Sequence, residues 1–280
     1  MTDGSGLDTD EIVGIATDLG GATELAPDSA VYVAGDGIRR VMMGIDIGPA
    51  ELLLAKHLGV DAVVAHHPAG GAAELGFPRV LPRQIELMVE AGVPIAVAKR
   101  VVEPRIAAMM LRVQAANFDR TPSVARLLGL PFLNVHLPLD EAGRRIMDRA
   151  IADHLGGLGR EAVVGDVRDA LLGIPEIRDA PTRVMVPVGR LDNPAGRVVV
   201  FHGAGTNGGF AVAEALFNHG VTTVVYIHVA AEDAERLRGL GRPEVNLVVS
   251  GHISSDMIGI NRFVTVLEDR GVEVMRMSGL

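Results

Sequence analysis

The chain has 280 residues, 48% of them hydrophobic and 22% charged, which suffices for one large or two small domains with a real core. The formal net charge of −9 disfavours nucleic acid as a partner, and no apolar stretch reaches the roughly 18 residues of a membrane span. The chain has no cysteine, which excludes disulfides, thiolate zinc sites and a cysteine nucleophile, and we expect a cytoplasmic protein.

Short runs of β-branched and other apolar residues recur along the chain and predict buried strands. Their apolar character is continuous rather than alternating, which is typical of strands covered on both faces. The predicted strands are Arg40–Ile45, Ala62–Ala65, Pro94–Ala98, Phe132–Val135, Arg183–Val186, Arg197–Phe201, Thr222–Ile227, Val245–Val249 and Val272–Met275.

Segments with helical spacing lie between most of these strands. The predicted helices are Ala50–Leu58, Pro82–Ala91, Glu103–Ala115, Asp140–Leu155, Gly209–His219, Ala231–Leu240 and Ile253–Arg270. Strand–helix–strand repetition predicts an α/β fold with mainly parallel sheets flanked by helices. The segment Leu191–Gly196 predicts a hairpin turn between two strands.

The first unusual strand end is Ala65-His66-His67-Pro68. In open α/β sheets, ligands bind beyond the carboxyl ends of the strands, so we expect site residues directly after the strands. Histidine is the commonest metal ligand at neutral pH, and at a turn both imidazoles can face one cleft. The alternative is a pair of ordinary loop histidines.

Two further strand ends combine a histidine with an aspartate. His136 is followed by Asp140, whose alternative role is to cap the helix that begins at Glu141. His252 and Asp256 have the i, i+4 spacing that lets both contact one metal ion, and the alternative is a solvated helix start.

A fourth strand end runs into the glycine loop 203–209, which precedes a predicted helix. A strand, a glycine turn and a helix can cradle a phosphate, but no lysine follows Gly208-Gly209 as it does in a Walker motif. A tight turn into a helix explains the loop at least as well.

Together these strand ends supply five nitrogen and oxygen ligands and no sulfur. This donor set suits one or two divalent ions such as zinc, iron or manganese. The five candidate ligands are His66, His67, Asp140, His252 and Asp256.

These motifs, in this order along the chain, resemble the NGG-one-interacting-factor-three-like family, also described as GTP cyclohydrolase type-two-like dinuclear-metal-centre proteins. The family's His-His-Pro is similar to 66–68, its His-Thr-x-Leu-Asp to 136–140, and its Gly-His-x-x-[Thr/Ser]-Glu to 251–256. The strand end at Asp46 resembles the family's strand-terminal aspartate. Asp256 replaces the usual glutamate, no tryptophan is present, and the helical segment Lys99–Pro131 looks inserted, so the chain resembles a divergent member.

The resemblance implies that the five candidate ligands hold two divalent ions per chain. It also implies two domains, with the chain termini meeting in the first. We expect residues 1–158 and 245–280 to form the metal-binding domain and residues 159–244 to form the second. A homohexamer is the assembly that the family implies.

Function follows from this site as two alternatives. One is a dinuclear-metal-dependent hydrolase that acts on an unidentified small molecule of the nucleotide or cyclic amide type. In that case His136 is the general base or the hydrogen-bond partner of a metal ligand, and Asp46 orients a metal ligand or the substrate. The other is a non-enzymatic metal-binding regulatory or protein-interaction protein. Open coordination positions favour the hydrolase.

Overall fold

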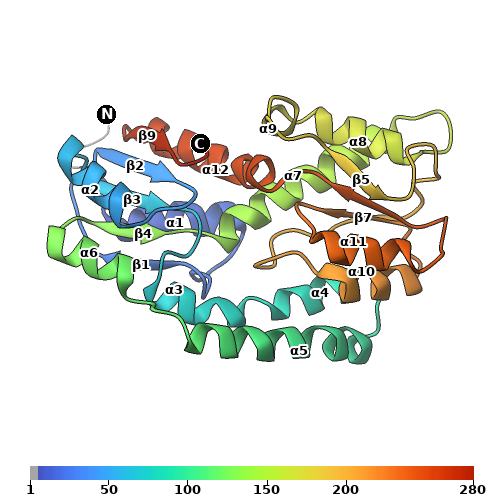
Figure 1. The fold of residues 1–280 in the computed structure, drawn as a ribbon. Coiled ribbons are helices and arrows are strands. Elements are labelled where there is room, and N and C mark those ends of the chain that lie inside the picture. Colours follow the sequence, from blue (N-terminus) through green and yellow to red (C-terminus); the bar gives the residue numbers. More distant parts are fainter. Residues whose placement is uncertain (1–5) are drawn as a thin grey trace. The chain divides into compact units, whose positions relative to one another are not determined.

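The computed structural model describes residues 6–280, which form two compact units (Figure 1). Unit 1 takes in the chain up to Val80, Ala107–Ala142 and Gly259–Leu280, and unit 2 takes in Leu81–Ile106 and Gly143–Ile258. Each unit contains a mainly parallel sheet flanked by helices, which confirms the predicted fold class. The first described helix and the last strand both belong to unit 1, as predicted.

Unit 1 contains a five-stranded sheet in the order β1–β4–β3–β2–β9, in which β1 is antiparallel to its neighbour and the other pairs are parallel. Its strands are β1 (Ala30–Val33), β2 (Arg40–Gly44), β3 (Ala62–Ala65), β4 (Phe132–Asn134) and β9 (Glu273–Met277). Its helices are α1 (Thr9–Gly20), α2 (Pro49–Leu58), α3 (Gly71–Gly76), the short 3₁₀ helix η1 (Phe77–Arg79) and α6 (Arg120–Leu128).

The two faces of this sheet are both covered, which explains the continuous apolar strands. In β2, Val41 and Met43 pack in one core with α1 and α12, whereas Met42 packs in a second core with α2 and α6. Alternate residues of one strand therefore enter two cores. Charged residues in the middle of β2 would be expensive on either face.

Unit 2 contains a four-stranded sheet in the order β5–β8–β7–β6, with β5 antiparallel to β8. Its strands are β5 (Met185–Val188), β6 (Val198–Val200), β7 (Thr223–Tyr226) and β8 (Asn246–Val249). Its helices are α4 (Pro82–Glu90), α8 (Val164–Leu172), α9 (Pro175–Arg178), α10 (Gly209–Asn218) and α11 (Ala231–Arg238).

Three long helices continue from one unit into the other along the chain. They are α5 (Ile95–Gln114), α7 (Leu137–Gly156) and α12 (His252–Asp269). Three of the four changes between units therefore fall within helices, and the fourth falls in the loop at Val80–Leu81. The predicted domain boundaries near residues 158 and 245 lie in other loops, and they stay a prediction. Among residues 6–280, no helix is both long and apolar enough to cross a bilayer.

Two local predictions are wrong. The run Pro94–Ala98 is the start of helix α5 rather than a strand, because the Pro94 carbonyl accepts hydrogen bonds from the Val97 and Ala98 amides and the buried Ala98 and Val102 share one helix face. The turn at Leu191–Gly196 joins β5 to β6, but these strands are not neighbours in the sheet, so it is no hairpin.

Candidate metal centre

The parallel register of unit 1 brings three strand ends to one edge of its sheet. Gly44 of β2 pairs with Ala65 of β3, and Ala65 pairs with Asn134 of β4. The residues that follow these strands are Asp46, the His66-His67 pair and His136. Within this unit, the residues that follow the three strands therefore lie at one edge of the sheet, where ligands bind in open α/β folds.

Side chains beneath this edge hold the His-His-Pro loop in place. The Tyr32 hydroxyl accepts a hydrogen bond from the Ala69 amide at 3.0 Å and donates one to Asn134 Oδ1 at 2.7 Å. The Asn134 amide in turn donates to the carbonyl of Asp28 at 2.8 Å. These bonds fix the backbone that follows the histidines, and the Asn134 amide also donates to the His66 carbonyl at 3.4 Å.

The unit 1 cluster consists of His66, His67, His136 and Asp140. Ring nitrogens of the three histidines lie within 4.8 Å of one another. His66 is fully buried and His136 nearly so, whereas the His67 side chain is 22% exposed. The cluster therefore has a closed side and a side that solvent can reach.

Each imidazole of this cluster donates its Nδ1 proton to an oxygen acceptor. The Nδ1 atoms of His66, His67 and His136 lie 3.0 Å from the Val135 carbonyl, 2.8 Å from Asp46 Oδ1 and 2.7 Å from Asp28 Oδ2, respectively. Because a carbonyl or a carboxylate only accepts, the proton is on Nδ1 in each ring. In the neutral imidazole, Nε2 then carries the lone pair that a metal ion needs.

The Asp140 carboxylate lies between two of these Nε2 atoms. Its Oδ1 is 3.2 Å from His66 Nε2 and its Oδ2 is 3.5 Å from His136 Nε2. Asp140 does not cap a helix that begins at Glu141, because α7 begins at Leu137 and the Asp140 amide already donates to the His136 carbonyl. Its buried carboxylate therefore faces the imidazoles from the first turn of the helix.

In unit 2 the same strand geometry gathers a second set of histidines. Tyr226 of β7 pairs with Val249 of β8, and Val200 of β6 pairs with Val225 of β7. His202, His228 and His252 each follow the end of one of these strands. The second unit thus repeats the arrangement of the first at the carboxyl edge of its own sheet.

Asp256 is the buried carboxylate of this unit 2 cluster, which consists of His202, His228, His252 and Asp256. His252 Nε2 lies 3.3 Å from Asp256 Oδ2, as the i, i+4 spacing predicts, and His202 Nε2 lies 3.9 Å from Asp256 Oδ1. The His228 and His252 rings are 4.7 Å apart between centroids. The His252 side chain is 39% exposed, whereas those of His202 and Asp256 are buried.

His228 differs from the histidines of unit 1 in its tautomer. The Asn207 amide donates to His228 Nδ1 at 2.8 Å, so the proton of the neutral ring is on Nε2. Burial, followed by the neighbouring His252, lowers the pKa of His228 to about 4. At neutral pH His228 is therefore an uncharged hydrogen-bond donor.

The glycine loop 203–209 is explained by its own geometry. Asn207 Oδ1 accepts a hydrogen bond from the Gly209 amide at 2.8 Å, which satisfies one donor at the start of α10. The buried Gln84 amide donates to the carbonyls of Ala204 and Thr206 at 3.3 and 3.0 Å. A tight turn that is held by these hydrogen bonds and leads into a helix accounts for the loop, and no phosphate-binding role is needed to explain it.

The two clusters, together with the carboxylates Asp46 and Asp28 that bind their histidines, comprise ten residues. Seven of these were candidates from the sequence, and three were not. Within unit 1, His66, His67, His136 and Asp140 come together with Asp46, and within unit 2, His252 and Asp256 do. His202, at the strand end before the glycine loop, was not assigned as a candidate ligand and His228 was missed, although both follow strands and could have been found by that signal. Asp28 lies in a loop before β1 and offers no such signal.

Buried histidine and aspartate side chains of both units could hold a metal ion. Solvent reaches the unit 1 cluster through a cavity of about 330 Å³ lined by Asp46, Glu51 and His67. Imidazoles with a fixed tautomer, a buried carboxylate and an adjoining cavity fit a divalent ion of borderline softness.

No protein-family model and no curated protein matches the chain. Among solved structures, a NIF3 superfamily protein from Sphaerobacter thermophilus is 59% identical, with a TM-score of 0.96 over 99% of this chain and 100% of that chain. TTHA1606 from Thermus thermophilus is 15% identical, with a TM-score of 0.54 over 97% and 98% of the two chains. Reduced HcgD from Methanocaldococcus jannaschii is 12% identical, with a TM-score of 0.53 over 96% and 97%. At these identities the last two show a shared fold alone.

Proposed function

Because the chain belongs to the NIF3 superfamily, we propose that it is a metal-dependent hydrolase whose centre is built from its strand-end histidines and aspartates. The carrying observation is the orientation of the unit 1 imidazoles. All three donate Nδ1–H to an oxygen, and two turn Nε2 toward the Asp140 carboxylate.

A positive charge between the imidazoles and the Asp140 carboxylate would stabilise this arrangement. A neutral His66 places a lone pair 3.2 Å from a carboxylate oxygen, and two acceptors at that distance repel each other. A cation that binds both removes the repulsion, and the donor set suits zinc, iron or manganese. A proton on Nε2 is the competing solution, so metal binding competes with protonation of the imidazole.

We propose that two divalent ions bind per chain and that His66, His67, Asp140, His252 and Asp256 are their ligands. The assignment of ligands from both units rests on the sequence motifs. When bound, such ions polarise a carbonyl or phosphoryl oxygen and make water acidic near neutral pH. The substrate is a small molecule of the nucleotide or cyclic amide type.

The supporting residues have separate tasks in this proposal. Asp46 and Asp28 hold His67 and His136 through their Nδ1 atoms, which fixes each ring and raises its basicity. His136 Nε2 accepts the proton of the attacking water, and Asp28 stabilises the imidazolium that results. His228 offers Nε2–H as a donor to the substrate.

By the same resemblance we propose that the chain forms a homohexamer and acts in the cytoplasm. The cavity beside His67 favours an enzyme over a regulatory metal-binding protein, because it leaves room for a substrate next to the ligands.

Metal content of the purified protein tests this proposal. After dialysis and reconstitution with zinc or manganese at pH 7.5, we expect about two equivalents per chain. His66→Ala should lose at least half of this metal, whereas His57→Ala, at an exposed position of α2, should keep all of it. Equal metal content in both variants contradicts the ligand assignment. Metal without hydrolysis of any nucleotide or cyclic amide leaves the non-enzymatic alternative.

A further inference from the structure

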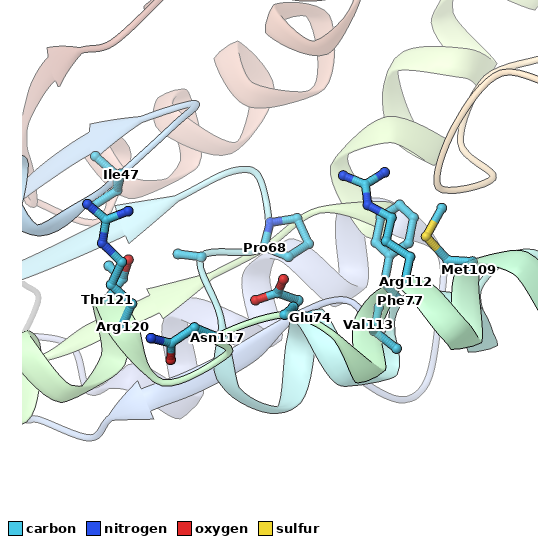
Figure 2. Close-up of a pocket in the computed structure, with 12 residues that line it drawn as sticks. Ile47, Pro68, Glu74, Phe77, Met109, Arg112, Val113, Asn117, Arg120 and Thr121 are labelled. Carbon is cyan, nitrogen blue, oxygen red and sulfur yellow. The ribbon is translucent and has the colours of Figure 1, made fainter.

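A larger cavity of about 440 Å³ lies within unit 1 and plays no part in the centre described above (Figure 2). It has the size of a small-molecule site. Its walls come from the loop after β2, the His-His-Pro loop, α3, η1, the C-terminal part of α5, the loop that follows it and the first turn of α6. We call it the arginine cavity, and the residues that matter are Ile47, Pro68, Glu74, Phe77, Arg112 and Arg120.

The arginine cavity is built against the unit 1 cluster. The Phe77 ring, which lines the cavity, stacks on the His136 imidazole with centroids 6.0 Å apart and planes inclined by 30°. Pro68, another lining residue, directly follows His67. A molecule in the cavity therefore lies one side-chain layer from two of the histidines.

The arginine cavity also shares a wall with the smaller cavity that His67 lines. Ile47, Pro68 and Ala69 line both. A ligand that is longer than one cavity can extend over this shared wall toward His67. The two cavities together offer a binding region with the imidazoles at one end.

Two arginines give the arginine cavity its charge. Figure 2 shows Arg112 and Arg120 toward opposite sides of it, with Glu74 and Asn117 between them. Neither arginine has an ion pair with a carboxylate anywhere in residues 6–280. Arg126 on the same helix as Arg120 is paired with Asp119 at 2.6 and 2.8 Å.

The chain has a net charge of −9, so most of its surface repels anions. An anionic ligand is therefore expected to bind at the unpaired guanidinium groups. A guanidinium recognises carboxylate and phosphate through two parallel hydrogen bonds. The Glu74 carboxylate can only accept, so it suits an N–H group of the ligand. Ile47 and Phe77 offer contact to an apolar portion.

We propose that the arginine cavity recognises the substrate, and that this substrate carries at least one carboxylate or phosphate group together with an N–H donor. The inference rests on the proposed hydrolase, since it names the substrate class of that same centre. Arg112 and Arg120 bind the anionic part, Glu74 receives the N–H, and the scissile group reaches the cavity of His67.

Calorimetric titration of the full-length protein, with its metal content measured on the same sample, tests this inference. The probes are N-acetyl-L-glutamate and phosphoethanolamine, which separate carboxylate from phosphate, and the control is the neutral N-acetylethanolamine. We expect at least one anionic probe to bind and the neutral compound not to. Arg112→Met and Arg120→Met should each weaken binding about tenfold, as the loss of a charge-assisted pair does, with unchanged metal content.

Arg262→Met serves as the matched control, because Arg262 is exposed, lies in the same unit and does not line the cavity. Glu74→Gln should weaken the binding of the probes that carry an N–H group. It should leave the binding of glutarate, which has no N–H group, unchanged. Failure of both anionic probes to bind the metal-loaded protein, or equal binding by the wild type and both arginine variants, overturns the inference. Absence of metal from every sample overturns the proposed function instead, and the substrate role falls with it.

Discussion

Each histidine of the unit 1 cluster owes its orientation to one oxygen atom. Without the acceptors on Val135, Asp46 and Asp28, the rings could turn or exchange tautomers, and Nε2 of His66 and His136 would no longer be held toward Asp140. Two of these acceptors are carboxylates, one buried and one 74% exposed. The buried one should matter more, since solvent cannot replace it.

Asp46→Asn tests this role at His67, which is one of the proposed ligands. The amide keeps the volume of the side chain but removes the charge that fixes Nδ1–H of His67, so metal affinity should fall roughly 10-fold. Competition with a chromogenic chelator measures the affinity. Asp18→Asn, at an exposed position of α1, is the control and should leave the affinity unchanged. Equal affinities of the two variants would mean that the Asp46 contact is only structural.

Site residues could be predicted from the sequence where they directly follow an apolar strand. His66, His136 and His252 follow apolar strands, and their positions are visible in the sequence. Asp28 is invisible, because its contact with His136 spans 108 positions and comes from a loop without any pattern. Local periodicity carries no information about such long-range hydrogen bonds.

At the scale of elements, strands β2 to β9 were predicted to within two residues at each end, and β1 was not predicted. The strand Ala62–Ala65 is found with the predicted bounds, and all four of its residues are buried. Strand β1 was not predicted, because three of its four residues are only half-buried and its bulged pairing with β4 disturbs the pattern. The predicted strand Pro94–Ala98 is the start of a helix, because the apolar residues that follow it have helical spacing. Here the helical spacing outweighs the strand preference of the β-branched residues.

The close approach of α12 to the start of α7 gives a stability prediction. A Cβ on Gly259 would collide with the Leu139 carbonyl, so Gly259→Ala should destabilise unit 1 by about 1–3 kcal/mol or more. A methyl group on Gly14 of α1 would meet no neighbouring element within 4 Å, so Gly14→Ala should stabilise by roughly 0.5–1 kcal/mol. Urea unfolding measures both, and effects of the same sign would contradict this packing.

Helix α8 should lose stability in acid. Its capping carboxylate, Asp166, accepts hydrogen bonds from Arg160 at 2.7 and 2.8 Å and from the Val163 amide at 2.8 Å, which lower the pKa of Asp166 to about 2. The folded pKa is below the ordinary 3.8, so this stabilisation is present above about pH 4 and is lost as the pH falls toward 2.

Thermal unfolding between pH 6 and pH 3 tests this dependence. Asp166→Asn should lower the unfolding temperature at pH 6, and the gap to the wild type should narrow as the pH approaches 3. A gap that stays constant over this range would show that the charge of Asp166 does not support the helix.

At the scale of the whole molecule, two sheets of related design each present histidines and buried aspartate at their carboxyl edge. The class of fold could be predicted from alternating strands and helices, whereas the predicted domain boundaries stay a prediction. Three helices belong in part to each unit, and helical periodicity does not reveal where packing partners change.

The assembly gives a prediction at this scale. Size-exclusion chromatography with light scattering should show a hexamer at micromolar concentration, as proposed from the family. A monomer or an isolated dimer at all concentrations would contradict the proposed assembly while leaving the metal centre untouched.

Anomalous X-ray diffraction from crystals of the zinc- or manganese-loaded protein would locate the metal ions of the proposed centre. We predict a peak about 2.0–2.2 Å from Nε2 of His66 and from a carboxylate oxygen of Asp140, with each Nδ1 still bound to its oxygen acceptor. No anomalous peak at these atoms in a well-ordered, metal-soaked crystal would contradict the account.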